Sequence, residues 1–260
     1  MNPGNFSVSA IILAKNEKER IAACLSGVGF CDERIVIDNS STDDTGVIAR
    51  KMGATVIASD ASDFAKLRNL GRESSGGDFL LYVDADETVT PPLQEEIRRI
   101  IRSFDPERDP HVYIVKRKNY YLGHRWPRVE RLERFFWKPA LLGWHGELHE
   151  SPQFRGRTAI LNHPLVHDTH RTVEEMVNKT NEWSTIEARL RYESGHPIVT
   201  PWRLFRVMGT GYVRSFIGER GISAGMAGLT ESVYQAFSMF VTYAKLYETE
   251  SGSVKQEYPL

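Results

Sequence analysis

The chain has few cysteines, no long apolar run and almost no net charge, and each of these shortages excludes a class of protein. With only Cys24 and Cys31 present, neither a disulfide scaffold nor a cysteine-based zinc site is expected. Both are predicted to be small buried residues in a reducing compartment, which favours a cytoplasmic location. A formal net charge of -1 gives no overall basic field, so nucleic acid is not an expected partner.

Several targeting and phosphate-binding signals are also missing. No run of about 18 apolar residues without charge is present, so no transmembrane helix is expected, and no basic segment precedes an apolar one at the start, so no signal peptide is expected. Neither Gly-x-Gly-x-x-Gly after the first predicted strand nor Gly-x-x-x-x-Gly-Lys-Ser/Thr occurs. The sequence therefore argues against a dinucleotide-binding protein and a P-loop NTPase.

The first third of the chain alternates short apolar runs with helical patterns. Continuous apolar runs of this length are typical of strands buried on both faces of a parallel sheet. The alternation predicts right-handed βαβ units, and hence an α/β fold with a mixed, mostly parallel, Rossmann-like sheet and flanking helices. The predicted strands are 7–14, 34–38, 54–58 and 78–84, and the predicted helices between them are 19–28, 45–52 and 64–73.

Acidic residues stand at the ends of these predicted strands. Asp38 ends the second strand, and Asp84 and Asp86 end the fourth. Ligands of open α/β sheets bind at the carboxyl ends of the strands, and two carboxylates one residue apart suit Mg²⁺ or Mn²⁺ carrying a diphosphate. The alternative is that these acids only cap the following helix.

Four short motifs, in this order, resemble the nucleotide-sugar half of glycosyltransferase family 2, which has the GT-A fold. The resemblance implies inverting transfer of a sugar from a nucleoside diphosphate donor, expected to be UDP-linked, with a divalent metal on the diphosphate. The motifs are Ala-Lys-Asn-Glu at 14–17, Val-Ile-Asp-Asn-Ser-Ser-Thr-Asp at 36–43, Arg-Asn at 68–69 and Val-Asp-Ala-Asp-Glu at 83–87.

The resemblance gives roles to particular residues. Asp38 would contact the base, and Arg68 would approach the nucleotide or its phosphates. Asp84 would meet the ribose or the metal, and Asp86 would bind the metal. The chemistry agrees, because a carboxylate accepts an N–H from a pyrimidine and a guanidinium makes bidentate contacts to phosphate. The alternative for Arg68 is a solvated charge on a helix.

The other predicted donor contacts are weaker. Asn16 and Glu17 follow the first strand, Asn69 follows Arg68, and Ala85 lies between the two aspartates. The alternative for Asn16 and Glu17 is that they only start the first helix. The alternative for Asn69 is a local cap or turn bond.

A second segment carries the features expected of an acceptor site. Residues 143–150 read Gly-Trp-His-Gly-Glu-Leu-His-Glu, and in a strand His145, Glu147 and His149 would share one face. The passage 120–150 resembles the subgroup of family 2 that includes lipopolysaccharide core β-glucosyltransferases, in which Gly-x-x-His-Glu follows an Arg-Leu-x-Arg-like strand. The resemblance implies a glycan or glycolipid acceptor in lipopolysaccharide or other cell-envelope polysaccharide synthesis.

Inverting transfer needs a base that takes the proton of the attacking hydroxyl. We predict Glu150 as this base, with Glu147 and Asp168 as the alternatives. His149 is predicted to complete the metal site with Asp84 and Asp86, and His167 is its rival. A structural hydrogen bond is the alternative for either histidine.

The domain prediction follows from composition. Residues 1–200 are expected to form the GT-A domain, with a nucleotide-sugar half at 1–105 and an acceptor half at 106–200. Residues 119–127 are expected to be a loop, and 201–260 a C-terminal helical extension. This extension mixes aromatic residues with arginines, which suits either peripheral contact with the inner membrane face or helix packing within a homo-oligomer.

Two other functions remain open at this point. A nucleotidyltransferase also uses strand-end carboxylates, Mg²⁺ and a nucleotide, although a glycine-rich basic loop is expected near its first strand. A non-catalytic nucleotide-sugar binding protein could be built on the same fold, because fold does not determine activity.

Overall fold

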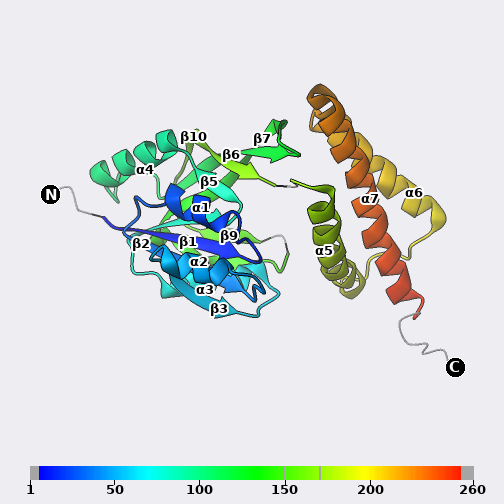
Figure 1. Ribbon diagram of the computed structural model, residues 1–260, viewed down its shortest axis with the longest axis horizontal. Coiled ribbons are helices and arrows are strands. Elements are labelled where there is room, and N and C mark those ends of the chain that lie inside the picture. The colour runs from blue at the N-terminus through cyan, green and yellow to red at the C-terminus, as the bar shows by residue number, and fades with distance from the viewer. Residues whose placement is uncertain (1–5, 149, 170, 253–260) are drawn as a thin grey trace. The chain divides into compact units, whose positions relative to one another are not determined.

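The computed structural model describes residues 6–148, 150–169 and 171–252, which form two compact units. The first unit consists of residues 6–118 and 129–167, and the second of residues 119–128 and 168–252, within the described ranges. Figure 1 shows both units, with most of their helices and strands labelled. Each unit is described by itself below.

Across the described residues, the strands form an eight-stranded sheet in the order β3-β2-β1-β4-β7-β6-β10-β5. The strands β1 (Val8–Ala14), β2 (Glu33–Asn39), β3 (Thr55–Ser59) and β4 (Phe79–Asp84) pair in parallel. The others are β5 (Glu87–Val89), β6 (Val112–Tyr121), β7 (His124–Trp137) and β10 (Thr158–Asp168). β7 pairs antiparallel with β4, and β5 with β10. The predicted α/β fold with a mostly parallel sheet is confirmed.

Helices cover this sheet, and apolar clusters fill the space beneath them. Every residue of β1 is buried, and alternate residues enter different clusters: Ile12 joins one, while Ile11 and Leu13 join the other. The continuous apolar run predicted for a strand buried on both faces is therefore confirmed. Cys24 and Cys31 are buried, as predicted. The helices are α1 (Ile21–Gly27), α2 (Thr45–Lys51), α3 (Phe64–Ser74) and α4 (Pro91–Ser103).

Helix α3 lies unusually close to the sheet. A Cβ added at Gly71 would lie 2.3 Å from Ile11 Cγ2, so only glycine permits this approach. Asp63 caps the helix by accepting a hydrogen bond from Lys66 N. The Asp63 cap and the close approach at Gly71 together fix the position of α3, and therefore the position of Arg68 on it.

One local prediction was wrong, and a second segment forms only part of the strand considered for it. Residues 119–127 were expected to form a loop, but β6 and β7 form a hairpin there, joined at Leu122 and Gly123, whose φ angles of 50° and 75° suit a tight two-residue turn. Residues 143–150 were considered as a strand, but the strand observed there includes only residues 143–145 of this segment. β8 (Leu141–His145) stops before Gly146, whose φ of 98° breaks the strand, and it pairs with β9 (Ser151–Phe154). Glu147 therefore shares no strand face with His145.

The second unit is helical. Its helices are α5 (Val173–Glu193), α6 (Pro201–Val213) and α7 (Gly225–Glu250), with π-helical residues 214–218 and 3-10 residues 221–224 between the last two. α5 and α6 both pack on α7, around a small cluster that includes Val207, Tyr243 and Leu246. None of the helices described is long and apolar enough to cross a membrane.

The tip of the β6–β7 hairpin belongs to this second unit. Trp126 is buried, and a Cβ added at Gly221 would lie 3.0 Å from its ring. Arg128 Nη1 also donates to Glu219 Oε1 at 3.0 Å. By internal contacts the first unit ends at residue 167, and the hairpin tip at 119–128 is part of the second unit.

Glu96 ties α4 to β10, the strand that carries His167. Its carboxylate accepts hydrogen bonds from Asn162 N at 2.8 Å and His163 N at 3.0 Å, and lies 2.8 Å from His163 Nδ1. Burial alone would raise the pKa of Glu96, but these hydrogen bonds lower the pKa below its usual value. The ionised form is therefore the one that holds the two elements together.

We expect Glu96→Gln to lower the free energy of unfolding by about 1–3 kcal/mol at neutral pH. Because the pKa is lower in the folded state, the carboxylate stabilises the fold above its unfolded pKa, ordinarily about 4.5, and this contribution is lost as pH falls through the folded value. Urea unfolding at several pH values measures both effects. The exposed neighbour Glu95, changed to Gln, is the control. A Glu96→Gln deficit that stays constant on acidification would contradict this assignment.

Candidate functional site

The predicted strand-end acids lie at one edge of the sheet. Asp38 is in register with Ala14, and Asp84 with Leu13, so the carboxyl ends of β2 and β4 flank the end of β1. Asp86 follows two residues after β4 ends. This is the edge at which ligands of open α/β sheets bind.

Asp38 is held between a loop and the first turn of α2. Its Oδ1 accepts a hydrogen bond from Ser41 N at 3.1 Å. A Cβ added at Gly46 would lie 2.7 Å from Asp38 Oδ2, so helix and carboxylate can approach this closely only because residue 46 is glycine. The side chain remains partly exposed at the edge of the sheet.

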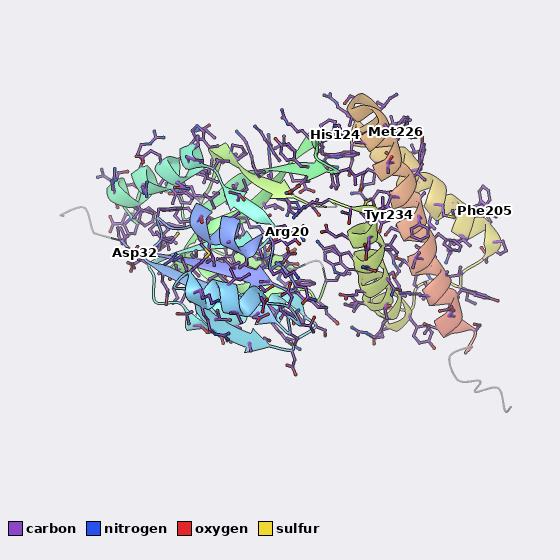
Figure 2. All side chains as sticks on the ribbon, viewed as in Figure 1. Arg20, Asp32, His124, Phe205, Met226 and Tyr234 are labelled. Carbon is purple, nitrogen blue, oxygen red and sulfur yellow. The ribbon has the colours of Figure 1, made fainter. Side chains whose placement is uncertain are left out.

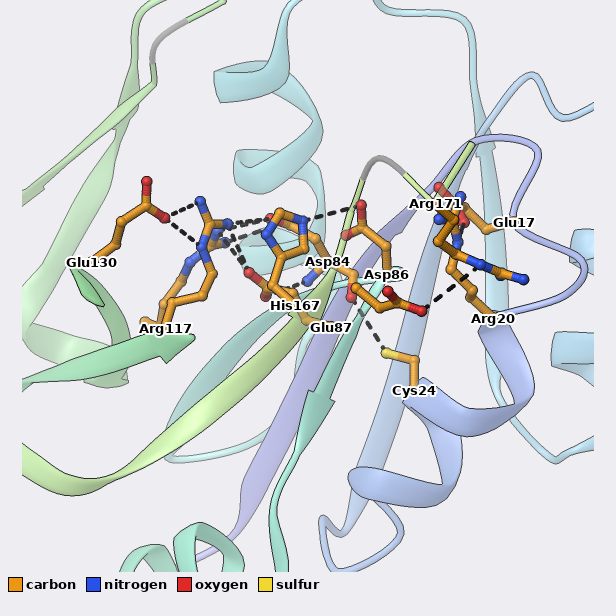
Figure 3. A network of polar contacts seen from close by, with 12 residues as sticks. Glu17, Arg20, Cys24, Asp84, Asp86, Glu87, Arg117, Glu130, His167 and Arg171 are labelled. Carbon is orange, nitrogen blue, oxygen red and sulfur yellow. Dashed lines mark hydrogen bonds and ion pairs between the residues drawn. The ribbon is translucent and has the colours of Figure 1, made fainter. Parts of the chain in front are cut away.

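Asn16 and Glu17 join the loop after β1 to the loop after β2. Asn16 has a φ of 55°, and its Oδ1 accepts a hydrogen bond from Thr42 N at 2.8 Å. Glu17 N donates to Thr45 Oγ1 at 2.8 Å, and the Glu17 side chain pairs with Arg20 (Figure 3). Both residues therefore shape the loops around Asp38.

The carboxylate of Asp84 lies among arginines (Figure 3). Arg134 Nη2 donates to Oδ2 at 2.7 Å, Arg68 Nη2 donates to Oδ1 at 3.0 Å, and Arg117 Nη1 lies 4.0 Å from Oδ2. Burial would raise the pKa of Asp84, but the charges of Arg134 and Arg68 outweigh it and hold the pKa well below its usual range. Both oxygens of Asp84 are therefore engaged by guanidinium groups.

Glu87 is a buried partner of both Arg117 and Asp84. It is fully buried, its Oε1 accepts from Arg117 Nη1 at 2.9 Å, and its Oε2 accepts from Asp84 N at 2.9 Å. Arg117 reaches further to Glu130, whose Oε2 accepts from Nη2 at 2.6 Å. Burial opposes the charge of Arg117, but Glu87 and Glu130 raise its pKa.

Arg68 links the Asp-x-Asp motif to Glu150. Its Nε and Nη2 both lie 2.7 Å from Glu150 Oε1, while Nη2 also contacts Asp84. The side chain is only 3% exposed, so it is not a solvated helix charge. Its guanidinium carbon lies 5.0 Å from the centroid of the Trp144 ring and 5.8 Å from that of Tyr82, within cation–π range. Nη1 is buried without a hydrogen-bond partner among the described residues.

Asn69 positions Trp144 beneath this arginine. Its Nδ2 donates to Trp144 O at 2.9 Å, and its Oδ1 accepts from Trp144 N at 2.9 Å. The amide thus fastens β8 to α3 through two hydrogen bonds between residues far apart in the sequence, and not through the local cap or turn bond considered as the alternative. Phe64 N likewise donates to Glu147 O at 2.9 Å, which holds the following loop at the start of α3.

The three candidate bases are placed differently. Glu150 lies in the cluster with a side chain 17% exposed. Glu147 is held through its backbone, and its side chain is partly buried. Asp168 falls in the second unit, where its Oδ2 lies 3.8 Å from Arg171 Nε. His149 lies outside the described residues.

Asp86 faces His167. The Oδ2 and Nε2 atoms are 3.2 Å apart, and both side chains are nearly buried (Figure 3). The antiparallel pairing of β5 with β10 sets His167 opposite Glu87, which brings the imidazole to the Asp-x-Asp motif. Ala85 lies buried between the two aspartates.

The Asp86 and His167 pair fits a divalent metal. Two neighbouring ligands of an octahedral ion with bonds of about 2.1 Å lie about 3 Å apart, close to the observed separation. Within the part of the chain that the structure describes, no three His, Cys, Asp or Glu side chains gather into a metal site. Further ligands would come from a diphosphate and water, as is usual for Mg²⁺.

Sequence reasoning gave no role to several residues of this cluster. Arg117, Arg134, Glu87 and Trp144 all contact the predicted site residues or hold them. Arg134 closes the Arg-Leu-x-Arg-like motif at 131–134, which was the available signal. It contacts Asp84 because β7 pairs antiparallel with β4.

The family match to known proteins covers the part of the chain that carries the candidate site. Residues 9–168 match the model of a family described as Glycosyl transferase family 2. The uncharacterized glycosyltransferase RP128 of Rickettsia prowazekii is 30% identical over 253 residues, covering 92% of this chain and 86% of that protein. The lipopolysaccharide core biosynthesis glycosyltransferase LpsC of Rhizobium meliloti is 24% identical, covering 93% of this chain and 92% of that protein. The crystal structure of S. aureus TarS 1-349 in complex with UDP-GlcNAc is 14% identical, with a TM-score of 0.48, over 97% of this chain and 93% of that one.

Glu87 and Glu130 both contact Arg117 but differ in burial, and this predicts different costs of removal. Glu87→Ala removes a fully buried carboxylate that pairs with Arg117 and accepts from Asp84 N, and we expect a loss of about 3–5 kcal/mol in the free energy of unfolding. Glu130 is 37% exposed, and Glu130→Ala should cost about 1 kcal/mol or less. Denaturant unfolding of the two variants measures both values. Equal losses would show that Glu87 does not anchor the cluster.

Proposed function

This chain belongs to glycosyl transferase family 2, and we propose that it is an inverting, metal-dependent enzyme that uses a UDP-linked sugar. Its GT-A fold and its activity as a glycosyltransferase go with that membership. One observation carries the proposal: Arg68 contacts both Asp84 of the Asp-x-Asp motif and Glu150. The donor-side carboxylates and the proposed base are therefore neighbours.

The donor would bind at the carboxyl edge of the sheet. Asp38, fixed by Ser41 N and by α2, is proposed to accept an N–H from the pyrimidine base. Asn16 and Glu17 would contribute through the loops that they join, and Ala85 through its backbone. Arg68 is proposed to approach the nucleotide or its phosphates, although its guanidinium is already paired with Asp84 and Glu150.

Asp86 and His167 are proposed to hold a divalent cation there. Asp84 is the weaker candidate, because both of its oxygens already accept hydrogen bonds from arginines. A bound cation would neutralise the negative charge that develops on the departing diphosphate. The role of these two side chains is to hold the ion at one place on the sheet edge.

Glu150 is proposed to take the proton of the acceptor hydroxyl. The bond from the acceptor oxygen to the anomeric carbon forms as the bond to the diphosphate oxygen breaks, so configuration inverts and the nucleoside diphosphate leaves. Arg68 holds one carboxylate oxygen of Glu150, which fixes the direction of the base. Glu147 and Asp168 are the alternative bases.

The acceptor is proposed to be a glycan or glycolipid of the lipopolysaccharide core, reached from the cytoplasmic face of the membrane. Similarity to LpsC along nearly the whole chain supports this assignment. So does the His-Glu segment that ends at Glu150, because it resembles the lipopolysaccharide core subgroup.

The metal assignment predicts that donor binding depends on Asp86. We expect calorimetry with UDP-, GDP- and TDP-sugars to show one donor that binds only with Mn²⁺ or Mg²⁺. Asp86→Ala should abolish this metal dependence and lower turnover by about 10²-fold or more. The exposed Asp60→Ala is the matched control. Near-normal, metal-stimulated turnover by Asp86→Ala would refute the assignment.

The base assignment predicts a different pattern for Glu150. Glu150→Gln preserves shape and removes basicity, so turnover should fall by about 10²–10⁴-fold while donor affinity changes little. Glu147→Gln tests the alternative base, and if Glu150 is the base this variant should retain most activity. Equal loss of donor affinity and turnover in Glu150→Gln would identify a binding role.

The same assays separate the other two functions. Release of pyrophosphate from a nucleoside triphosphate would indicate a nucleotidyltransferase. Donor binding by the folded chain, with neither transfer nor donor hydrolysis, would indicate a non-catalytic nucleotide-sugar binding protein.

A further inference from the structure

The outer face of α6 and of the π-helical residues after it carries several large exposed apolar side chains. The inner face of the helix packs on α7, where Val207 is buried and a Cβ at Gly211 would lie 3.0 Å from Met239. On the opposite face the fractional exposures are 75% for Trp202, 69% for Phe205, 51% for Val213 and 64% for Ile217. Phe205 projects away from the helices in Figure 2.

These positions form one stripe. Successive members, counting Gly209 between Phe205 and Val213, are three or four residues apart, which places them on one side of a helix. Ile222 and Met226, exposed by 63% and 76%, continue the apolar surface into the next turns. Single exposed apolar residues are common, but a contiguous row marks an interaction surface.

The same segment is basic. Residues 195–230 contain four arginines and one glutamate. That glutamate, Glu219, accepts a hydrogen bond from Arg128 at 3.0 Å and lies 3.7 Å from Arg214. Arg206 and Arg220 are exposed beside the apolar stripe. The surface therefore combines aromatic and aliphatic groups with positive charge.

We propose that this face of α6, with Ile222 and Met226, binds the surface of an anionic lipid bilayer. A helix that lies in the interfacial plane places Trp and Phe among the acyl chains near the headgroups, while arginines meet the lipid phosphates. Each arginine near such a surface contributes through its attraction to anionic lipid. All the residues concerned lie in the second unit, so the surface is complete within it.

A second copy of the chain is the competing occupant, and the charges argue against it. In a two-fold interface the same patch faces itself. The arginines of this patch would then oppose arginines, and its single glutamate is already engaged by Arg128. Like charges across an interface are unfavourable. An anionic bilayer offers both the apolar volume and the opposite charge.

This inference goes beyond the proposed reaction and does not rest on it. Binding to vesicles needs no donor, metal or acceptor. A failure of the membrane proposal therefore leaves the metal and base assignments untouched, and a failure of those assignments leaves vesicle binding to be measured.

Flotation of the full chain with vesicles tests the proposal. We expect binding to phosphatidylcholine vesicles that contain about one third phosphatidylglycerol, weak binding to phosphatidylcholine alone, and loss of binding as salt rises. Brominated lipid should quench part of the tryptophan fluorescence. Trp202→Phe should remove that quenching while the vesicles still bind.

Variants identify the surface. Trp202→Ser combined with Phe205→Ser should weaken vesicle binding by about tenfold or more, and Arg206→Gln by about fivefold. Tyr192→Ser on α5 and Tyr247→Ser on α7 are controls, because both side chains are more than half exposed and lie outside the stripe. Circular dichroism and thermal melting establish that each variant is folded.

Two results would overturn the proposal. One is no binding of the folded chain to anionic vesicles at low salt. The other is a dimer in solution that becomes a monomer on Trp202→Ser and Phe205→Ser, with vesicle binding unchanged, since that would make the face an interface between copies.

Discussion

The ion pairs of a single buried guanidinium hold the proposed active site together. Arg68 is charged in a place almost without water, so it must keep its carboxylate partners. Burial opposes its charge, but Asp84 and Glu150 raise its pKa, and the guanidinium stays protonated. Helix α3, the end of β4 and the loop after β8 meet at this one side chain.

The supporting contacts follow from that constraint. Gly71 lets α3 approach β1, and Asn69 fixes Trp144 under the guanidinium. Arg134 pairs with the carboxylate of Asp84, and Arg117 pairs with that of Glu87. The centre of the cluster is rigid because its members each meet more than one group of opposite charge; they are Arg68, Arg117, Arg134, Asp84 and Glu87. Such rigidity suits a site that must hold a base and a donor in fixed positions.

Much of the first unit could be predicted because the relevant signals are local. The apolar runs give the parallel strands, and Asp38, Asp84 and Asp86 stand where those strands end. The remaining residues depend on register between distant segments. Arg134 reaches Asp84 through the β4–β7 pairing, and His167 reaches Asp86 through β5–β10. A sequence pattern carries the periodicity of each strand but not its alignment with another.

Both cysteines are buried in the first unit, and one lies directly below the site. Cys24 Sγ is 3.5 Å from the carbonyl oxygen of Asp84. Burial raises the pKa of both thiols, with nearby carboxylates adding to the effect, so neither forms a reactive thiolate in the folded chain. Alkylating reagents would therefore modify these thiols only when the first unit opens. The chain thus contains two natural reporters of local opening, one of them at the floor of the proposed donor site.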